Sequence, residues 1–257
     1  YHSLKRNLGY FGEIRLDYKG IAHISGTARN DYSSTLSEKS YFYPSVTAGV
    51  IFSELFHISN EFFTYGKLRG NWAQVGKDTN PYAFDKRFVI KGSFPDQGFG
   101  VDPTKSRAQW LDPELASSWE VGLDLRFFND KTKFDLAYYQ TKVDNQIVTV
   151  RVSPTQGNIL QTRNEGAIQN KGVELQWNQE IMRNRDFQWY ANLNFGFNRG
   201  KVTNLPDDIV EIQGTQYGDI FPTAYLNGST TAISGKDYMR SPDGQVVCTA
   251  DGLSLIH

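Results

Sequence analysis

The chain is first described by what it lacks. Its 257 residues include two methionines and one cysteine, Cys248. A single cysteine cannot form a disulfide within the chain, which excludes a small secreted scaffold held together by disulfides. No apolar run approaches the roughly 18 residues that indicate a transmembrane helix. Lysine plus arginine (27) nearly equals aspartate plus glutamate (28), so no basic excess indicates nucleic acid as a partner.

Motifs for catalysis and for cofactors are also missing. The four histidines show no metal-ligand spacing, and neither a nucleophile elbow nor a phosphate-binding loop is present. Glu120 and Asp124 lie four residues apart, and paired carboxylates can hydrolyse a glycosidic bond when they are held at the right separation. Ion pairing with Arg126, Arg69 and Lys67 is the favoured interpretation of these acids. We therefore predict no catalytic residue, no metal and no cofactor.

The chain is rich in aromatic residues, at 14%, and these follow a two-residue period. Over residues 186–199, Phe187, Trp189, Leu193 and Phe195 fall on one parity, while the other parity is filled largely by asparagine, glutamine and glycine. Alternate residues of a strand point to opposite faces. This pattern, over about ten residues, is typical of a strand that crosses a bilayer at a tilt.

The alternation recurs, and it predicts an all-β fold. Strands are expected near 10–18, 21–30, 43–53, 62–75, 116–128, 133–148, 168–180 and 186–199. Most have a polar face that carries charges, which a membrane barrel places in a wet lumen. We predict an antiparallel up-and-down transmembrane β-barrel, present in part as about eight strands. The alternative is a soluble β-sandwich that binds carbohydrate, because half-buried sandwich strands alternate in the same way.

The predicted links alternate between short and long. Short links are expected at 19–20, 54–61, 129–132 and 182–185, and long ones at 31–42, 76–116, 154–169 and after Gly200. A barrel inserted in one direction has tight turns on the periplasmic side and long loops outside. This alternation favours the barrel over the sandwich.

Four spaced segments resemble one family. Residues 111–130 (LDPELASSWEVGLDLRFFND), 65–76, 164–175 and 29–34 resemble, in order, segments of the SusC/RagA family of TonB-linked (TonB-dependent) outer-membrane transporters. The similarity covers about residues 10–200. It implies part of a gated import channel of about 22 strands that has a plug inside the barrel.

The resemblance also implies a function. The expected activity is nutrient uptake, by TonB-dependent import of a large polar nutrient, a glycan or oligopeptide, across the outer membrane of a Gram-negative, Bacteroidetes-type cell. The implied partners are a SusD-like surface lipoprotein and TonB, the latter through a segment absent from this chain. Residues 1–200 are expected to be barrel, and 201–257 an extracellular or lumenal loop region with the start of a following strand. Since there is no initiator methionine, signal peptide or plug, we expect an internal fragment of a larger protein.

Two residue sets are candidates for contact with the solute. The polar parity of the strands predicts a lumen lining made of Lys67, Arg69, Glu120, Asp124, Arg126, Glu174, Gln176, Asn192 and Asn194. Aromatic side chains in an external loop can stack on sugar rings or on peptide side chains. The candidates in the 76–116 link are Tyr82, Phe84, Phe88, Phe94, Phe99 and Trp110. Packing of the loop on itself is the alternative role for each of them.

Overall fold

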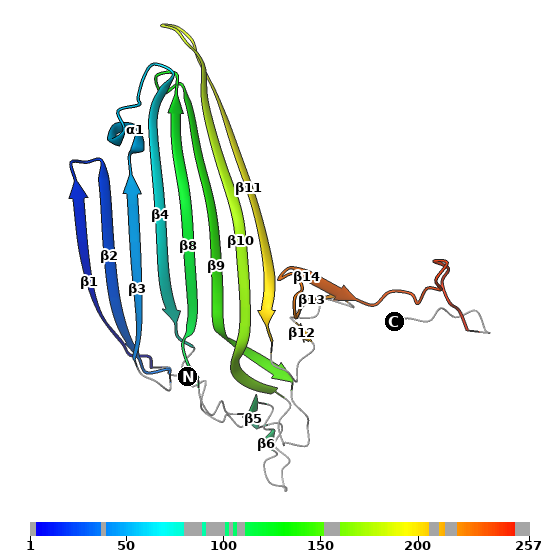
Figure 1. The fold of residues 1–257 in the computed structure, drawn as a ribbon. Coiled ribbons are helices and arrows are strands. Elements are labelled where there is room, and N and C mark those ends of the chain that lie inside the picture. The colour runs from blue at the N-terminus through cyan, green and yellow to red at the C-terminus, as the bar shows by residue number, and fades with distance from the viewer. Residues whose placement is uncertain are drawn as a thin grey trace.

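The computed structural model describes residues 4–36, 40–79, 111–151, 160–205 and 220–249, together with a few short strands between these ranges. Eight long strands run antiparallel in one sheet (Figure 1). They are β1 (Asn7–Tyr18), β2 (Ala22–Ser33), β3 (Ser40–Val50), β4 (Phe63–Lys77), β8 (Glu114–Phe127), β9 (Thr132–Arg151), β10 (Leu160–Arg183) and β11 (Gln188–Asn204). Each pairs with its neighbour in sequence, so the predicted all-β, up-and-down meander is confirmed.

The remaining elements are small. A one-turn helix, α1 (Phe52–Leu55), lies between β3 and β4, and β5 (Val89–Ile90) pairs with β6 (Val101–Asp102). Strand β7 (Lys105–Ser106) adds to β10, while β12 (Glu211–Gln213), β13 (Ile220–Tyr225) and β14 (Ala232–Gly235) form a separate sheet. In the described part of the chain, no helix has the length and apolar character needed to cross a membrane.

Tight turns join the strands at one end of the sheet. Lys19 (φ 51°) and Gly20 (φ 71°) both adopt left-handed conformations between β1 and β2. Two consecutive left-handed residues suit the right-handed twist of a hairpin. Phe128, Asn129 and Asp130 are also left-handed between β8 and β9. These short turns hold the register of the strands that they join.

Several predicted strand boundaries differ from the structure, and three of the differences change the links. Strand β3 stops at Val50, and the segment 51–62, expected to be a short link after residue 53, contains α1. The link between β2 and β3, expected to be long, spans only residues 34–39, so short and long links do not alternate without exception. Strand β10 begins at Leu160, within the predicted 154–169 loop, because β9 continues to Arg151, past Asp144, the last residue that it pairs with β8, and β10 pairs with this extension.

The register aligns apolar residues across the whole sheet. One row of directly paired residues runs Tyr18, Ala22, Val50, Leu68, Leu123, Leu136, Leu175 and Phe195. The next row on the same face runs Leu16, Ile24, Ala48, Gly70, Val121, Tyr138, Val173 and Phe197. Residues paired across strands point to the same face. The sheet therefore has one continuous apolar face, as the two-residue period predicted.

The apolar face is open to the surroundings instead of being packed in a core. The buried apolar side chains among the described residues are Leu36, Leu111, Ala167, Val202 and Leu205, all of them toward the end of the sheet opposite the tight turns. Leu16 is 64% exposed and Phe197 is 58% exposed. Since the eight strands form a single sheet and no second sheet in the described residues covers it, the β-sandwich alternative is not supported. Among the described strands, β1 and β11 lie at the two edges of the sheet and do not pair with each other, so the sheet does not close on itself there.

Candidate functional site

The polar face of the sheet gathers the residues that were predicted to line a lumen. Lys67 pairs with Asp124, and Glu174 lies opposite Gly196. Gln176 is paired with Asn194, and this pair lies next to the Glu174–Gly196 pair on the same face. The whole predicted set, including Arg69, Glu120, Arg126 and Asn192, shares this face. That these residues line a lumen stays a prediction.

Exposure differs between the two faces in the middle of the sheet. On β4 and β8, the apolar Leu68 and Val121 are 45% and 47% exposed. The charged side chains of Arg69 and Asp124, on the same two strands, are only 32% and 27% exposed. A soluble protein shows the opposite distribution, with charges outside and apolar groups buried. On β4 and β8 the polar face is therefore the more enclosed side of the sheet.

Arg69 organises the charges at the centre of the polar face. Its guanidinium donates two hydrogen bonds to Asp135, at 2.7 Å and 3.2 Å, and its Nε lies 3.8 Å from Glu120 Oε1. A planar guanidinium forms such forked contacts with a carboxylate readily. The Arg69 side chain lies across Gly122, which has no Cβ to obstruct it.

A second arginine, Arg126, forms an ion pair on the same face. Arg126 Nε lies 3.7 Å from Asp124 Oδ1, and its guanidinium sits 4.4 Å from the centre of the Tyr65 ring. The predicted ion pairing is confirmed for Arg69 and Arg126, whereas Lys67 has no ion pair among the described residues. Because Glu120 and Asp135 share one arginine, the arrangement is that of a structural charge cluster.

Next to this cluster the polar face is hollowed. A concavity of about 400 Å³ is lined by residues that include Arg69, Glu120, Asp135, Glu174, Gln176 and Asn194. Its lining offers carboxylates, amides and one guanidinium, so it can exchange hydrogen bonds with a polar solute. No described group of three or more histidine, cysteine or acidic side chains could hold a metal ion.

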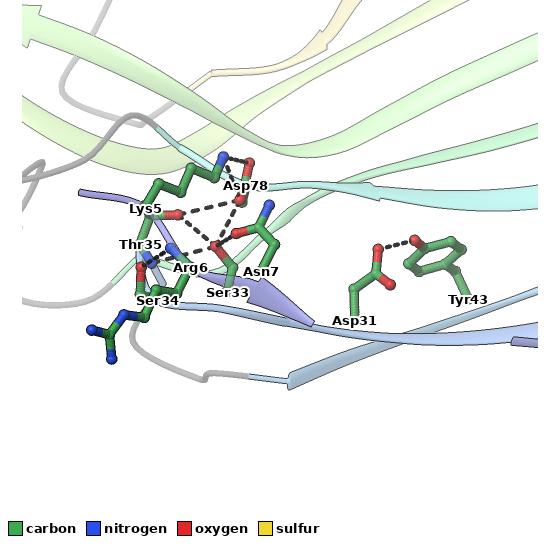
Figure 2. A network of polar contacts seen from close by, with 9 residues as sticks. All are labelled: Lys5, Arg6, Asn7, Asp31, Ser33, Ser34, Thr35, Tyr43 and Asp78. Carbon is green, nitrogen blue, oxygen red and sulfur yellow. Dashed lines mark hydrogen bonds and ion pairs between the residues drawn. The ribbon is translucent and has the colours of Figure 1, made fainter. Parts of the chain in front are cut away.

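A second polar network ties together chain segments at the opposite end from the tight turns (Figure 2). Asp78, directly after β4, accepts hydrogen bonds from Lys5 Nζ at 2.6 Å and from Ser33 Oγ at 2.6 Å. Thr35 Oγ1 lies 3.4 Å from the same carboxylate. Ser33 and Thr35 are buried, at 2% and 4% exposure. The network joins the segment before β1, the end of β2 and the end of β4.

The environment of Asp78 changes its acidity. Burial alone would raise the pKa of this carboxyl, but hydrogen bonds from Lys5, Ser33 and Thr35 favour the charged form and the pKa is lowered overall. Sequence reasoning did not single out Asp78 or Lys5. The resemblance of residues 29–34 to a family segment was the one signal that included Ser33.

A third group lies beside this network, on the polar face. The Arg29 guanidinium donates to Asp31 Oδ1 at 2.8 Å, and the Tyr43 hydroxyl donates to Asp31 Oδ2. Arg29 also lies 5.9 Å from the centre of the Tyr43 ring. The charges of Arg29 and Asp31 therefore compensate each other. The six loop aromatics predicted to contact solute, Tyr82, Phe84, Phe88, Phe94, Phe99 and Trp110, lie outside the described residues, so their role stays a prediction.

Comparison with known proteins identifies the family. Residues 2–247 match the family model described as "TonB dependent receptor-like, beta-barrel". The chain is 28% identical to TonB-dependent receptor P3 of Formosa agariphila, over 94% of this chain and 27% of that protein. It is 25% identical to TonB-dependent receptor SusC of Bacteroides thetaiotaomicron, over 77% of this chain and 21% of that protein. The chain thus spans about a quarter of the length of these relatives, which are named as receptors and not as enzymes.

A solved structure shares the fold. The RagAB peptide transporter superposes on this chain with a TM-score of 0.77 at 19% identity, covering 98% of this chain and 29% of that one. The predicted resemblance to the SusC/RagA family and the predicted partial barrel are confirmed.

Proposed function

Because this chain belongs to the TonB-dependent receptor-like β-barrel family, we propose that it forms part of the wall of an outer-membrane importer. The apolar face contacts lipid, and the polar face lines the path of a large polar nutrient, a glycan or an oligopeptide. The observation that carries this proposal is the inverted exposure on β4 and β8, where the charged Arg69 and Asp124 are more enclosed than the apolar Leu68 and Val121. Charge on a lipid-facing strand costs roughly 2–4 kcal/mol at mid-depth, so the polar face is the inner one.

The orientation follows from the links. In the full-length protein, the end that carries the short turns faces the periplasm, and the end that carries the Asp78 network and the 78–113 link faces the exterior. TonB supplies energy through a segment outside this chain. A SusD-like lipoprotein covers the external mouth, an arrangement that the match to SusC and the RagAB structure supports. Residues 1–200 belong to the wall, which β11 extends to Asn204, and the rest of 201–257 belongs to an extracellular or lumenal loop region with the start of a following strand.

Cysteine labelling tests which face is wet. In the full-length receptor in outer membranes, Asn194→Cys should react with a water-soluble maleimide and Phe195→Cys should not, since adjacent strand residues face opposite sides. Because β11 is well defined on both sides of this pair, the two variants differ only in face. Labelling of Phe195→Cys with protection of Asn194→Cys would reverse the orientation and remove the proposed lumen.

Deletion within the 76–116 link tests whether this link acts at the external opening of the barrel. Removing residues 82–110 should reduce growth on the cognate nutrient or reduce pull-down of the lipoprotein, while outer-membrane abundance stays near normal, because loops add little to barrel stability. Deletion of residues 37–39 in the shorter β2–β3 link, which keeps the buried Leu36, serves as the matched control. Normal growth and normal pull-down after the long deletion would remove this link from the mechanism.

A further inference from the structure

The link between β3 and β4 differs from the other turns at its end of the sheet. Figure 1 places it with the turns that join β1 to β2, β8 to β9 and β10 to β11. Those turns are residues 19–21, 128–131 and 184–187, and each has only one apolar side chain, Ile21, Phe128 or Phe187. Residues 51–62, which we call the apolar link, contain Ile51, Phe52, Leu55, Phe56, Ile58 and Phe62. Such a composition is unexpected for a turn that lies wholly in water.

The apolar link is docked at the outer side of the wall. Strand β3 ends opposite Leu68, and α1 lies beside the part of β4 that precedes this pair. The buried Ser53 Oγ accepts a hydrogen bond of 3.0 Å from the Gly66 backbone N–H. Ser53 is 1% exposed, and it satisfies a donor that β3 no longer reaches. The docking position of the link is therefore specific.

Aromatic contacts show which face of the sheet the link joins. The Phe52 ring lies against Gly66 and stacks on Phe63 with 6.1 Å between ring centres. Gly66 is paired with Leu125, which belongs to the apolar face. Phe63 in turn contacts Phe127, at 5.5 Å between ring centres. The link thus continues the apolar face at its turn end.

The outer side chains of the link remain uncovered. Leu55, Phe56, Ile58 and Phe62 are 45%, 66%, 45% and 59% exposed. Phe62 lies 5.1 Å from Phe128 and 5.7 Å from Phe127, between ring centres, so the exposed group is continuous with the aromatic edge of the wall. Phe56 follows Phe52 by four residues, which places both on one side of the turn of helix.

We propose that the apolar link is an interfacial anchor that inserts into the phospholipid surface at the periplasmic rim of the barrel. The proposal rests on the proposed outer-membrane function, because the apolar face must contact lipid for its continuation to do so. Burying apolar side chains of this size is favourable, and amphipathic segments settle at the boundary between headgroups and acyl chains. The exposed polar residues of the link, which keep contact with water, are Glu54, His57, Ser59, Asn60 and Glu61.

Spin labelling measures this insertion directly. The full-length receptor is reconstituted in phosphatidylethanolamine–phosphatidylglycerol bilayers, with a nitroxide at Phe56→Cys, and its collisions with oxygen and with a water-soluble nickel chelate are compared. Ile58→Cys is the second position in case the first variant folds poorly. Asn129→Cys, in the polar turn between β8 and β9, is the matched control. Leu123→Cys, on the apolar face, reports whether the wall itself is in lipid.

The expected result is a severalfold higher ratio of oxygen to nickel collisions at residues 56 and 58 than at residue 129. Ratios at 56 and 58 equal to that at 129, with a lipid-type ratio at 123, would overturn the anchor and leave the proposed function intact. A water-type ratio at residue 123 would overturn the proposed function and the anchor together. A lipid-type ratio at 123 with raised ratios at 56 and 58 supports both.

Discussion

The two faces of the sheet are held by different means. On the apolar face, the register places like beside like over all eight strands, so any one residue has interchangeable neighbours. On the polar face, Arg69 has one forked partner, Asp135, and Tyr139 has one glycine, Gly172, over which its ring lies. The stability of the apolar face therefore depends only on its side chains being apolar. The stability of the polar face depends on individual pairs of residues. Matched substitutions on the two faces test this difference.

The largest effect is expected from a charge on the apolar face. Leu123→Arg should prevent stable insertion, because an arginine near mid-depth costs roughly 2–4 kcal/mol on a lipid-facing strand. Asp124→Asn, the next residue on the same strand, should leave insertion near normal. Outer-membrane abundance and urea unfolding of the full-length receptor measure both. Equal losses for the two variants would mean that the faces do not differ as described.

Glycines on the two faces provide a second test. A Cβ added at Gly172 meets the Tyr139 ring, whereas one added at Gly26, on the apolar face, meets nothing within 4 Å. Gly172→Val should therefore destabilise the receptor by about 1–3 kcal/mol, as overpacking does. Gly26→Val should change the free energy of unfolding by less than about 0.5 kcal/mol. A larger loss for Gly26→Val would contradict the proposed contact between Tyr139 and Gly172.

Removing the central guanidinium should have a smaller effect. Arg69→Met leaves Asp135 and Glu120 without their shared partner, but these side chains are 44% and 35% exposed and can be solvated by water. The expected loss is at most about 1 kcal/mol. Lys67→Met, which removes a charge that has no ion pair among the described residues, is the control. Unfolding at low and at high salt separates the variants, since only the Arg69 contribution should weaken with salt.

The smallest effect on stability is expected at the Asp78 network, which lies at the end of the sheet opposite the tight turns. A carboxyl whose folded pKa lies below its unfolded value of about 3.9 stabilises the fold above that value, and this stability is lost as the pH falls through the folded pKa. The unfolding midpoint of the receptor should therefore decline below about pH 4, and Asp78→Asn should flatten this decline. Asp130→Asn, at the opposite end of the sheet, is the control. An identical pH profile for Asp78→Asn and the unchanged receptor would count against the network as drawn.

Much of the wall was predictable because its signals are local. A two-residue period is a property of consecutive residues, so it identified all eight strands and assigned Trp119, Glu120 and their neighbours to faces before any pairing was known. Turn residues such as Lys19 and Gly20 are local signals as well. Errors came where apolar residues lacked a clear period, as in the segment 51–62, whose apolar side chains belong to a link and not to a strand.

The contacts at the candidate sites depended on the tertiary structure. Arg69 and Asp135 are 66 residues apart, and Lys5 and Asp78 are 73 apart, so their contacts follow from the accumulated register of several strands. The contact of Ser53 with Gly66 likewise depends on strand ends. Strand β3 ends at Val50, opposite Leu68, so the β4 residues before Leu68 have no partner in β3 and Gly66 is free to bond to Ser53. A local pattern states which way a side chain points. Its partner is decided by turns, bulges and strand ends elsewhere in the chain, and these act together only when the sheet is assembled.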